Sequence, residues 1–221
     1  MRQVLAVLLC VTLGIILIFS LSGIWDDRFA VAHILHHNFN LGLDSSVAEK
    51  FNHGLAFLAA FFLLIARLQV RSRALVFLTV LYGAIWFDDS ARYHERAGEK
   101  LGRALDLPYR FGLGPQEYGE LLAWAILGVI LALVFLWSWA GRRGGDGGVI
   151  APFFLCFVLL ALCGIGADML HNVMPPYLDL LMQVIEDGGE MIAVTLSAAL
   201  AFGVYRNVKA YFDAMSEPSE D

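Results

Sequence analysis

Hydrophobic residues collect in six long stretches of this chain, separated by shorter segments rich in polar residues, glycine and proline. A helix of about 20 apolar residues crosses the hydrocarbon core of a bilayer, and each stretch is long enough to do so. The pattern therefore predicts an all-α fold, a polytopic membrane helix bundle with six transmembrane helices. We expect these helices at about 3–23, 51–70, 74–95, 118–140, 149–172 and 177–205.

The first stretch begins close to the start of the sequence and resembles a secretory signal at first sight. Its apolar run, from about Val4 to Leu21, is longer than the roughly 7–15 residues of a signal peptide, and no small-residue cleavage pattern ends it. We expect it to remain as the first membrane helix. Residues 1–212 then form a single six-helix transmembrane domain, with outer loops at about 24–50 and 96–117 and a disordered acidic tail at 213–221.

Composition supports a membrane protein and excludes other classes. Of the 221 residues, 59% are hydrophobic and only 16% are charged, whereas a soluble globular domain carries about 25% charged residues. A water-soluble function is therefore excluded, and membrane lipids are the expected surroundings. No basic cluster indicates binding to nucleic acid.

The positions of lysine and arginine predict the orientation in the membrane, because cytoplasmic loops carry an excess of these residues. One set of helix ends holds most of the unbalanced bases, and for six helices this set places both the N- and the C-terminus in the cytoplasm. The bases are Arg2, Arg67, Arg71, Arg73, Arg142, Arg143, Arg206 and Lys209. The compact chain with short inner turns is typical of a bacterial inner membrane, and the opposite ends of the helices would face the periplasm.

Ionisable residues interrupt three of the hydrophobic stretches, and they do so at the outer end of each predicted helix. The segments are 87–95, 167–172 and 186–190. A charged group inside a bilayer is costly unless it is paired, hydrated or bound, so such residues mark functional sites. Three segments far apart in the sequence thus deliver acids and histidines to one layer near the outer face.

Helical spacing groups these side chains into pairs that can converge. Asp88 and Glu95 are seven residues apart, and Asp168 and His171 are three apart; Glu186 is followed by an acid four residues later. Carboxylates and imidazoles without thiolates suit zinc, or two iron or manganese ions. The candidate metal ligands are Asp88, His94, Glu95, Asp168, His171, Glu186 and Glu190. Glu95 and Glu186 are also the candidate catalytic bases.

Two short motifs resemble known metal or hydrolase elements. Asp168-x-x-His171 is chemically similar to the Glu-x-x-His element of di-iron carboxylate bundles. Ser90-x-x-x-His94 resembles the Ser/His element of the ceramidase-like membrane hydrolases, which also have a late His-x-x-x-His pair. In this chain the corresponding region offers Glu186-x-x-x-Glu190 instead.

A purely structural interpretation stays open beside the metal site. Arg92 lies four residues after Asp88 and can pair with it in an outer salt-bridge network that holds helices together. Asp89 and Asp187 are expected to point elsewhere on their helices. Membership of the site is left open for His33, His36, His37, His53, Glu117 and Glu120.

The function expected first is that of a membrane-embedded metalloprotein, a metal-dependent enzyme acting on a lipid or lipid-like substrate near the outer membrane face. One alternative is an ion or proton transporter, but the inner halves of the predicted helices carry few ionisable groups for a continuous path. Another is a non-catalytic membrane subunit or sensor held together by its polar layer. Its outer loops would then bind a membrane protein partner or form a homo-oligomer.

Overall fold

The computed structural model describes residues 2–25, 41, 46–142 and 145–213. Helices are the regular elements within these ranges, and the part of the chain described contains no β-strand. The α-helices are α1 (Arg2–Trp25), α3 (Val47–Gln69), α4 (Arg73–Ala91), α5 (Tyr93–Ala104), α6 (Pro115–Ala140), α7 (Asp146–Ala161), α8 (Asp168–His171) and α9 (Asp179–Asp213). A π-helical segment, η1 (Leu162–Ala167), joins α7 to α8, and a 3-10 turn, η2 (Pro176–Leu178), precedes α9.

Six helical segments within the described ranges are long and apolar enough to cross a membrane. They are α1, α3, α4, α6, the continuous segment from α7 to α8, and the segment from η2 into α9. The prediction of an all-helical fold with six helices long and apolar enough to cross a membrane is thereby confirmed for the described residues, and these helices are compatible with an integral membrane protein. The histidines at 33, 36 and 37 and the tail after Asp213 lie outside the described residues, as does most of the loop at 24–50.

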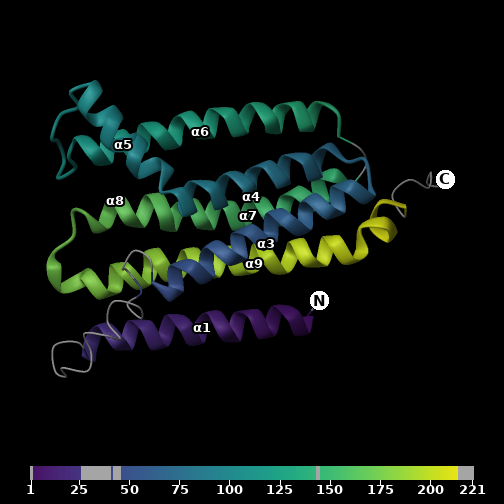
Figure 1. The fold of residues 1–221 in the computed structure, drawn as a ribbon, viewed down its shortest axis with the longest axis horizontal. Helices are drawn as coiled ribbons and strands as arrows, with labels where there is room; N and C mark the ends of the chain where they lie inside the picture. The colour runs from purple at the N-terminus through teal and green to yellow at the C-terminus, as the bar shows by residue number, and fades with distance from the viewer. Residues whose placement is uncertain (1, 26–40, 42–45, 143–144, 214–221) are drawn as a thin grey trace.

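The long helices run side by side along the molecule, and α5 lies across one end of the bundle next to the start of α6 (Figure 1). The start of α1 and the end of α9 lie at the opposite end. Helix α9 packs against α3, α1 and α7, while α4 packs against α3, α6 and α7. The three ion-rich segments of the sequence therefore all fall at the end that carries α5 and α8.

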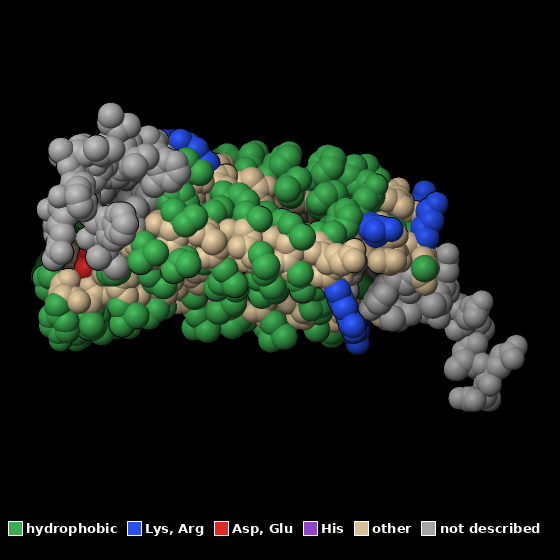
Figure 2. Space-filling model, turned by 90° about the horizontal axis from the view of Figure 1, so that it is seen from below, with side chains coloured by type: hydrophobic (Ala, Val, Ile, Leu, Met, Phe, Trp, Pro, Cys, Tyr) green, Lys and Arg blue, Asp and Glu red, His purple; other side chains and the backbone are tan. Residues whose placement is uncertain are grey.

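The outer surface is what a lipid environment requires. A hydrophobic belt covers the middle of the molecule, and most Lys and Arg side chains in view lie at the end where α1 starts and α9 ends (Figure 2). Large apolar side chains of several spans are exposed, among them Val7, Leu133 and Leu155. Exposure of such a surface to water would be unfavourable, whereas contact with the acyl chains of a bilayer is not.

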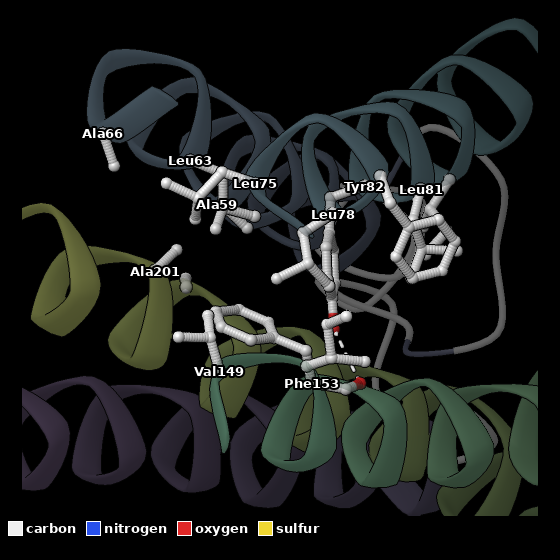
Figure 3. Packing of buried hydrophobic residues seen from close by; sticks show 14 of the residues in the cluster. Ala59, Leu63, Ala66, Leu75, Leu78, Leu81, Tyr82, Val149, Phe153 and Ala201 are labelled. Atoms are coloured by element: carbon white, nitrogen blue, oxygen red, sulfur yellow. Dashed lines mark hydrogen bonds between the residues drawn. The ribbon is translucent and has the colours of Figure 1, made fainter. Parts of the chain in front are cut away.

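Buried side chains of α3, α4, α7 and α9 fill the middle of the bundle (Figure 3). Leu78, Tyr82 and Phe153 are completely buried there. The Tyr82 hydroxyl lies 2.7 Å from Oγ of Ser197 and 3.3 Å from the carbonyl oxygen of Phe153, to which it donates. A buried hydroxyl without a partner would destabilise a membrane bundle, so these bonds fix the register of three helices.

Local sequence signals determine where several helices begin. Ser46 accepts a hydrogen bond from the backbone N–H of Glu49 and caps α3. Ser72 caps α4 through the N–H of Leu75, and its hydroxyl donates to Asp146 at 2.9 Å, which ties the start of α4 to the start of α7. Such side-chain caps satisfy donors that the first helical turn leaves unpaired.

The expectation of one unbroken helix over 74–95 is wrong. Arg92 has φ +49° and ψ +47°, a left-handed conformation that ends α4 and starts α5 in a new direction. Asp88 and Glu95 therefore do not share a stripe on one helix, and much of the expected outer loop at 96–117 is helical. The close packing of α5 on α6 depends on Gly98 and Gly119, because a Cβ at either position would overlap the other helix.

Candidate functional site

A cavity of about 610 Å³ lies within the end of the bundle that carries α5 and α8. We call it the acidic cavity, because its wall carries many carboxylates, contributed by α3, α4, α5, α6, α8 and α9. They are Glu49, Asp89, Glu95, Glu117, Glu120, Asp168, Glu186, Asp187 and Glu190. Arg92, His53 and His94 are the ionisable bases of the wall. Apolar side chains, including Trp124, Leu131 and Phe157, complete it.

The Asp88 carboxylate holds His94 in position from the last turn of α4. Oδ1 of Asp88 accepts the backbone N–H of His94 at 3.1 Å, and Oδ2 lies 2.7 Å from Nδ1 of the ring. Asp88 is 2% exposed, so both contacts are shielded from solvent. Since an ionised carboxylate only accepts, Nδ1 carries a proton and Nε2 keeps no hydrogen-bond partner among the described residues. The ring is also stacked on Trp124, with ring centres 5.0 Å apart.

Asp88 also shifts the proton affinity of His94, which lies outside the membrane-spanning segments. Burial by itself lowers the pKa of His94, but the hydrogen bond to Asp88 and the charges of Asp88, Glu95 and Asp89 outweigh burial. The pKa of His94 is therefore raised above its ordinary value. A cation that binds Nε2 must displace the second proton of the charged ring, while the proton on Nδ1 stays with its hydrogen bond to Asp88.

Arg92 pairs with Glu95 and not, as the structural interpretation expected, with Asp88. Nε of Arg92 donates to both carboxylate oxygens of Glu95 at 2.9 Å, and Nη2 contacts Oε2. This two-pronged contact, which is the strongest form of ion pair, closes the first turn of α5. It gives Glu95 a basic partner, whereas Asp89, Asp168, Asp187 and Glu190 form no ion pair with another described residue.

The π-helical segment η1 brings the fifth span close to α9. A Cβ at Gly164 would overlap the carboxylate of Glu190, and a Cβ at Gly189 would overlap the sulfur of Cys163. Small residues thus let η1 and α9 approach closely. π-Turns inside helices frequently occur at functional sites, and this one directly precedes Asp168.

His171 links the end of α8 to the beginning of α9. Its Nδ1 lies 2.9 Å from Oε2 of Glu186, and its Nε2 lies 2.8 Å from Oδ1 of Asp179. Because both ring nitrogens face carboxylates, each contact is a hydrogen bond only when its nitrogen carries a proton. In this arrangement the ring bridges two acids and offers no free nitrogen to a metal.

Two further polar side chains of the wall were not assigned by the sequence. Asn52 of α3 is 6% exposed, and its Oδ1 has no hydrogen-bond partner in the described structure. Glu120 of α6 is 8% exposed and accepts a hydrogen bond from the Gln116 side chain at 2.9 Å. A buried amide oxygen without a donor is unfavourable, so a ligand or water that donates to Asn52 would stabilise this part of the cavity.

The acidic cavity brings together part of the predicted ligand set and adds to it. His94, Glu95, Asp168, Glu186 and Glu190 line it, whereas Asp88 contacts it only through His94, and His171 only through Glu186. Asp89 and Asp187, which we expected to point elsewhere, are part of the wall, as are Glu117, Glu120 and His53. Across the described ranges, no group of three or more Asp, Glu, His or Cys side chains is close enough to hold a metal ion.

Glu49 of α3 is the wall residue that the sequence reasoning missed. It lies within the first turn of a membrane-spanning helix and 3.7 Å from His53, one turn further on. An acid and a histidine four residues apart were therefore a readable signal. His53 was left open as a member of the site, but Glu49 was overlooked because it lies in the expected loop at 24–50.

Comparison with known proteins places the whole bundle in one family. Residues 3–204 match the family DUF8692, described as a domain of unknown function. The chain belongs to this family. The matched region includes every residue of the cavity wall. No curated protein and no solved structure matches the chain.

Proposed function

We propose that the acidic cavity binds a divalent metal, either one zinc ion or two iron or manganese ions, and that the protein is a membrane-embedded metalloprotein. The observation that carries the proposal is the pair formed by Asp88 and His94. A histidine that binds a metal through one ring nitrogen commonly donates the other N–H to a carboxylate, which fixes the ring. His94 has this arrangement, with Nε2 left over in a wall of carboxylates.

The charge balance of the cavity favours a bound cation. Among the described residues, nine carboxylates line the wall against one arginine and two histidines, and the arginine pairs with Glu95. Like charges gathered in a region of low dielectric repel each other strongly unless something positive lies among them. A divalent cation supplies two positive charges in one small ligand.

The residues proposed to hold the cation come from three elements. His94 lies on α5, Asp168 on α8, and Glu186 and Glu190 on α9. The long glutamate side chains would have to change rotamer to meet one ion, since no three groups are within reach of each other in the described ranges. A bound metal would polarise an oxygen of the substrate or activate a water molecule.

Of the two candidate catalytic bases, Glu95 and Glu186, we propose that Glu186 accepts the proton in the reaction. Both carboxylate oxygens of Glu95 accept hydrogen bonds from the guanidinium of Arg92, which leaves them less accessible to a substrate. Glu186 is hydrogen-bonded to the ring of His171 and lines the cavity. His171 and Asp179 then hold the Glu186 carboxylate in place.

A lipid or lipid-like molecule is the proposed substrate, because the cavity is polar on one part of its wall and apolar on another. Leu127, Leu131, Phe157 and Leu160 form the apolar part.

The buried core of the bundle argues against the alternative of an ion or proton transporter. Leu78, Phe153 and their neighbours fill the bundle beyond the cavity with mainly apolar side chains.

We further propose that the ends of α1 and α9 that carry the chain termini face the cytoplasm of a bacterial inner membrane, with the cavity on the periplasmic side. The support is the excess of Lys and Arg at the terminal end. Reporter fusions that are active only on one side of the membrane test this directly. A C-terminal fluorescent protein that stays dark while a C-terminal alkaline phosphatase is active would reverse the orientation.

Metal analysis of the purified protein tests the central proposal. The full chain, stripped with a chelator and dialysed against zinc, manganese or iron(II), should retain at least one ion per chain. His94→Gln and Glu190→Gln should each lose it, while Glu99→Gln, an exposed acid of α5 outside the cavity, should not. Retention of no metal, or equal retention in all three variants, contradicts the proposal.

A further inference from the structure

A second hollow, of about 350 Å³, lies between α4 and α6 beside α5. We call it the α4–α6 groove. Asp88 lines it, while its partner His94 lines the acidic cavity, so the two spaces meet at this hydrogen-bonded pair. Apart from Asp88, the groove is formed by apolar or aromatic residues of the three helices.

The groove opens on a surface that faces lipid. Phe87 of α4 is 55% exposed, and Ile126 and Ile130 of α6 are 50% and 51% exposed. Both helices are membrane-spanning candidates. Acyl chains of the bilayer are therefore in direct contact with the edges of the groove.

Helix α5 adds an amphipathic border to the groove. Tyr93, Ala97 and Leu101, four residues apart and so on one helical face, all line it. Arg96 and Lys100 are exposed and precede Ala97 and Leu101 by one residue, so they flank the apolar face. In the described structure neither base forms an ion pair, whereas Arg103 on the same helix contacts Glu99.

The apolar groove therefore lies next to two basic side chains, as the acyl chains of a phospholipid lie next to its phosphate group. We propose that the α4–α6 groove holds an acyl chain of an anionic phospholipid whose phosphate meets Arg96 and Lys100. Helix α5 directly follows the end of a membrane-spanning helix, which places these bases at the level of the headgroups. Interfacial Lys and Arg attract anionic lipids in this way. The inference goes beyond the metal site and stands whether or not the cavity binds a cation.

The first test measures headgroup preference. The full chain is incorporated into vesicles of equal parts phosphatidylglycerol and phosphatidylcholine, released in mild detergent, and its retained lipids are counted by native mass spectrometry. The wild type should retain phosphatidylglycerol in preference. Arg96→Gln and Lys100→Gln should each lower this preference about fivefold, whereas Arg103→Gln, with the same loss of charge on the same helix, should leave it unchanged. Equal retention of both lipids by the wild type overturns the proposal, as does an unchanged preference in both variants.

The second test probes the groove itself. Ala97→Phe places a large ring in the groove and should abolish the retained phosphatidylglycerol, while Ala104→Phe, on an exposed residue at the end of α5, should not. Phosphatidylglycerol with a photoreactive group in its acyl chain should label peptides of α5 and α6 in the wild type. Labelling that is spread evenly over the exposed faces of α1 and α6, or that survives Ala97→Phe, overturns the proposal even if that variant folds poorly.

Discussion

Nδ1 of His94 lies 2.7 Å from Oδ2 of Asp88, and this contact forms part of the wall between two spaces of different chemistry. The histidine faces a cavity lined by acids, and the aspartate faces an apolar groove open to lipid. Leu127 of α6 lines both spaces as well. The fold thus holds a polar site and a lipid-facing site side by side.

Replacing Asp88 with Asn should destabilise the protein. The change removes the charge that fixes the ring and the backbone N–H of His94, at a position that is 2% exposed. We expect a loss of about 2 kcal/mol, the size of a charge-assisted hydrogen bond. Thermal unfolding in detergent, followed by near-UV circular dichroism, measures it. Glu99→Gln serves as the control, and equal unfolding temperatures for both variants would show that the pair contributes nothing.

The stabilising effect of this pair should depend on pH. The folded pKa of His94 is raised by Asp88, so the pair stabilises most when the ring is charged. The contribution is fully present below the ordinary histidine pKa of about 6.5 and is lost as pH rises through the higher folded pKa. The difference in unfolding temperature between wild type and Asp88→Asn should therefore shrink as the pH is raised. A difference that grows with pH contradicts this assignment.

A methyl group at Gly98 should disrupt the contact between α5 and α6. Its Cβ would overlap both the side chain and the backbone of Glu120. Overpacking of this kind costs about 1–3 kcal/mol. Gly54→Ala, in α3 with nothing within 4 Å of the added Cβ, is the matched control and should be neutral or slightly stabilising. The measurement is the unfolding temperature of each variant. An unchanged unfolding temperature in Gly98→Ala would be inconsistent with this packing.

Within η1, two glycines allow a matched test of the proposed cation site. Gly164→Ala would push against the carboxylate of Glu190, whereas Gly166→Ala meets nothing within 4 Å. If Glu190 holds the cation, Gly164→Ala should weaken metal affinity at least about tenfold, because moving a ligand costs no less than removing a residue that orients one. Calorimetric titration with zinc or manganese compares the variants. The same affinity in both would remove Glu190 from the site.

The sequence predicted the spans because hydrophobic length is a strong signal, and it predicted the common depth of the acids because helical rise converts position into depth. It did not predict the end of α4 at Arg92. That break involves neither glycine nor proline, and it depends on Asp88 binding the N–H of a residue six positions later. Sequence reasoning that counts only three- and four-residue spacings overlooks such a contact.

The sequence also did not show which of two adjacent acidic residues lines the cavity. Of Asp88 and Asp89 only Asp89 lines the cavity, whereas Glu186 and Asp187 both line it, and these positions depend on the rotation of each helix about its axis. That rotation is set by packing against neighbouring helices, which the low amphipathicity of membrane spans does not reveal. Asp88 was therefore assigned to the metal and Asp89 to the surroundings, whereas the structure places Asp89 in the cavity wall.

Each turn of η1 contains more residues than a turn of α-helix, so Leu162–Ala167 accommodates a surplus position within the fifth span. Deleting a single residue there would let the segment wind as ordinary α-helix, with Asp168 and His171 still facing in their present direction. Deleting a residue from regular α-helix in α7 would instead turn everything beyond it by about 100°, unless η1 gave up its surplus position. The surplus position thus allows the fifth span to change in length without redirecting this part of the acid layer.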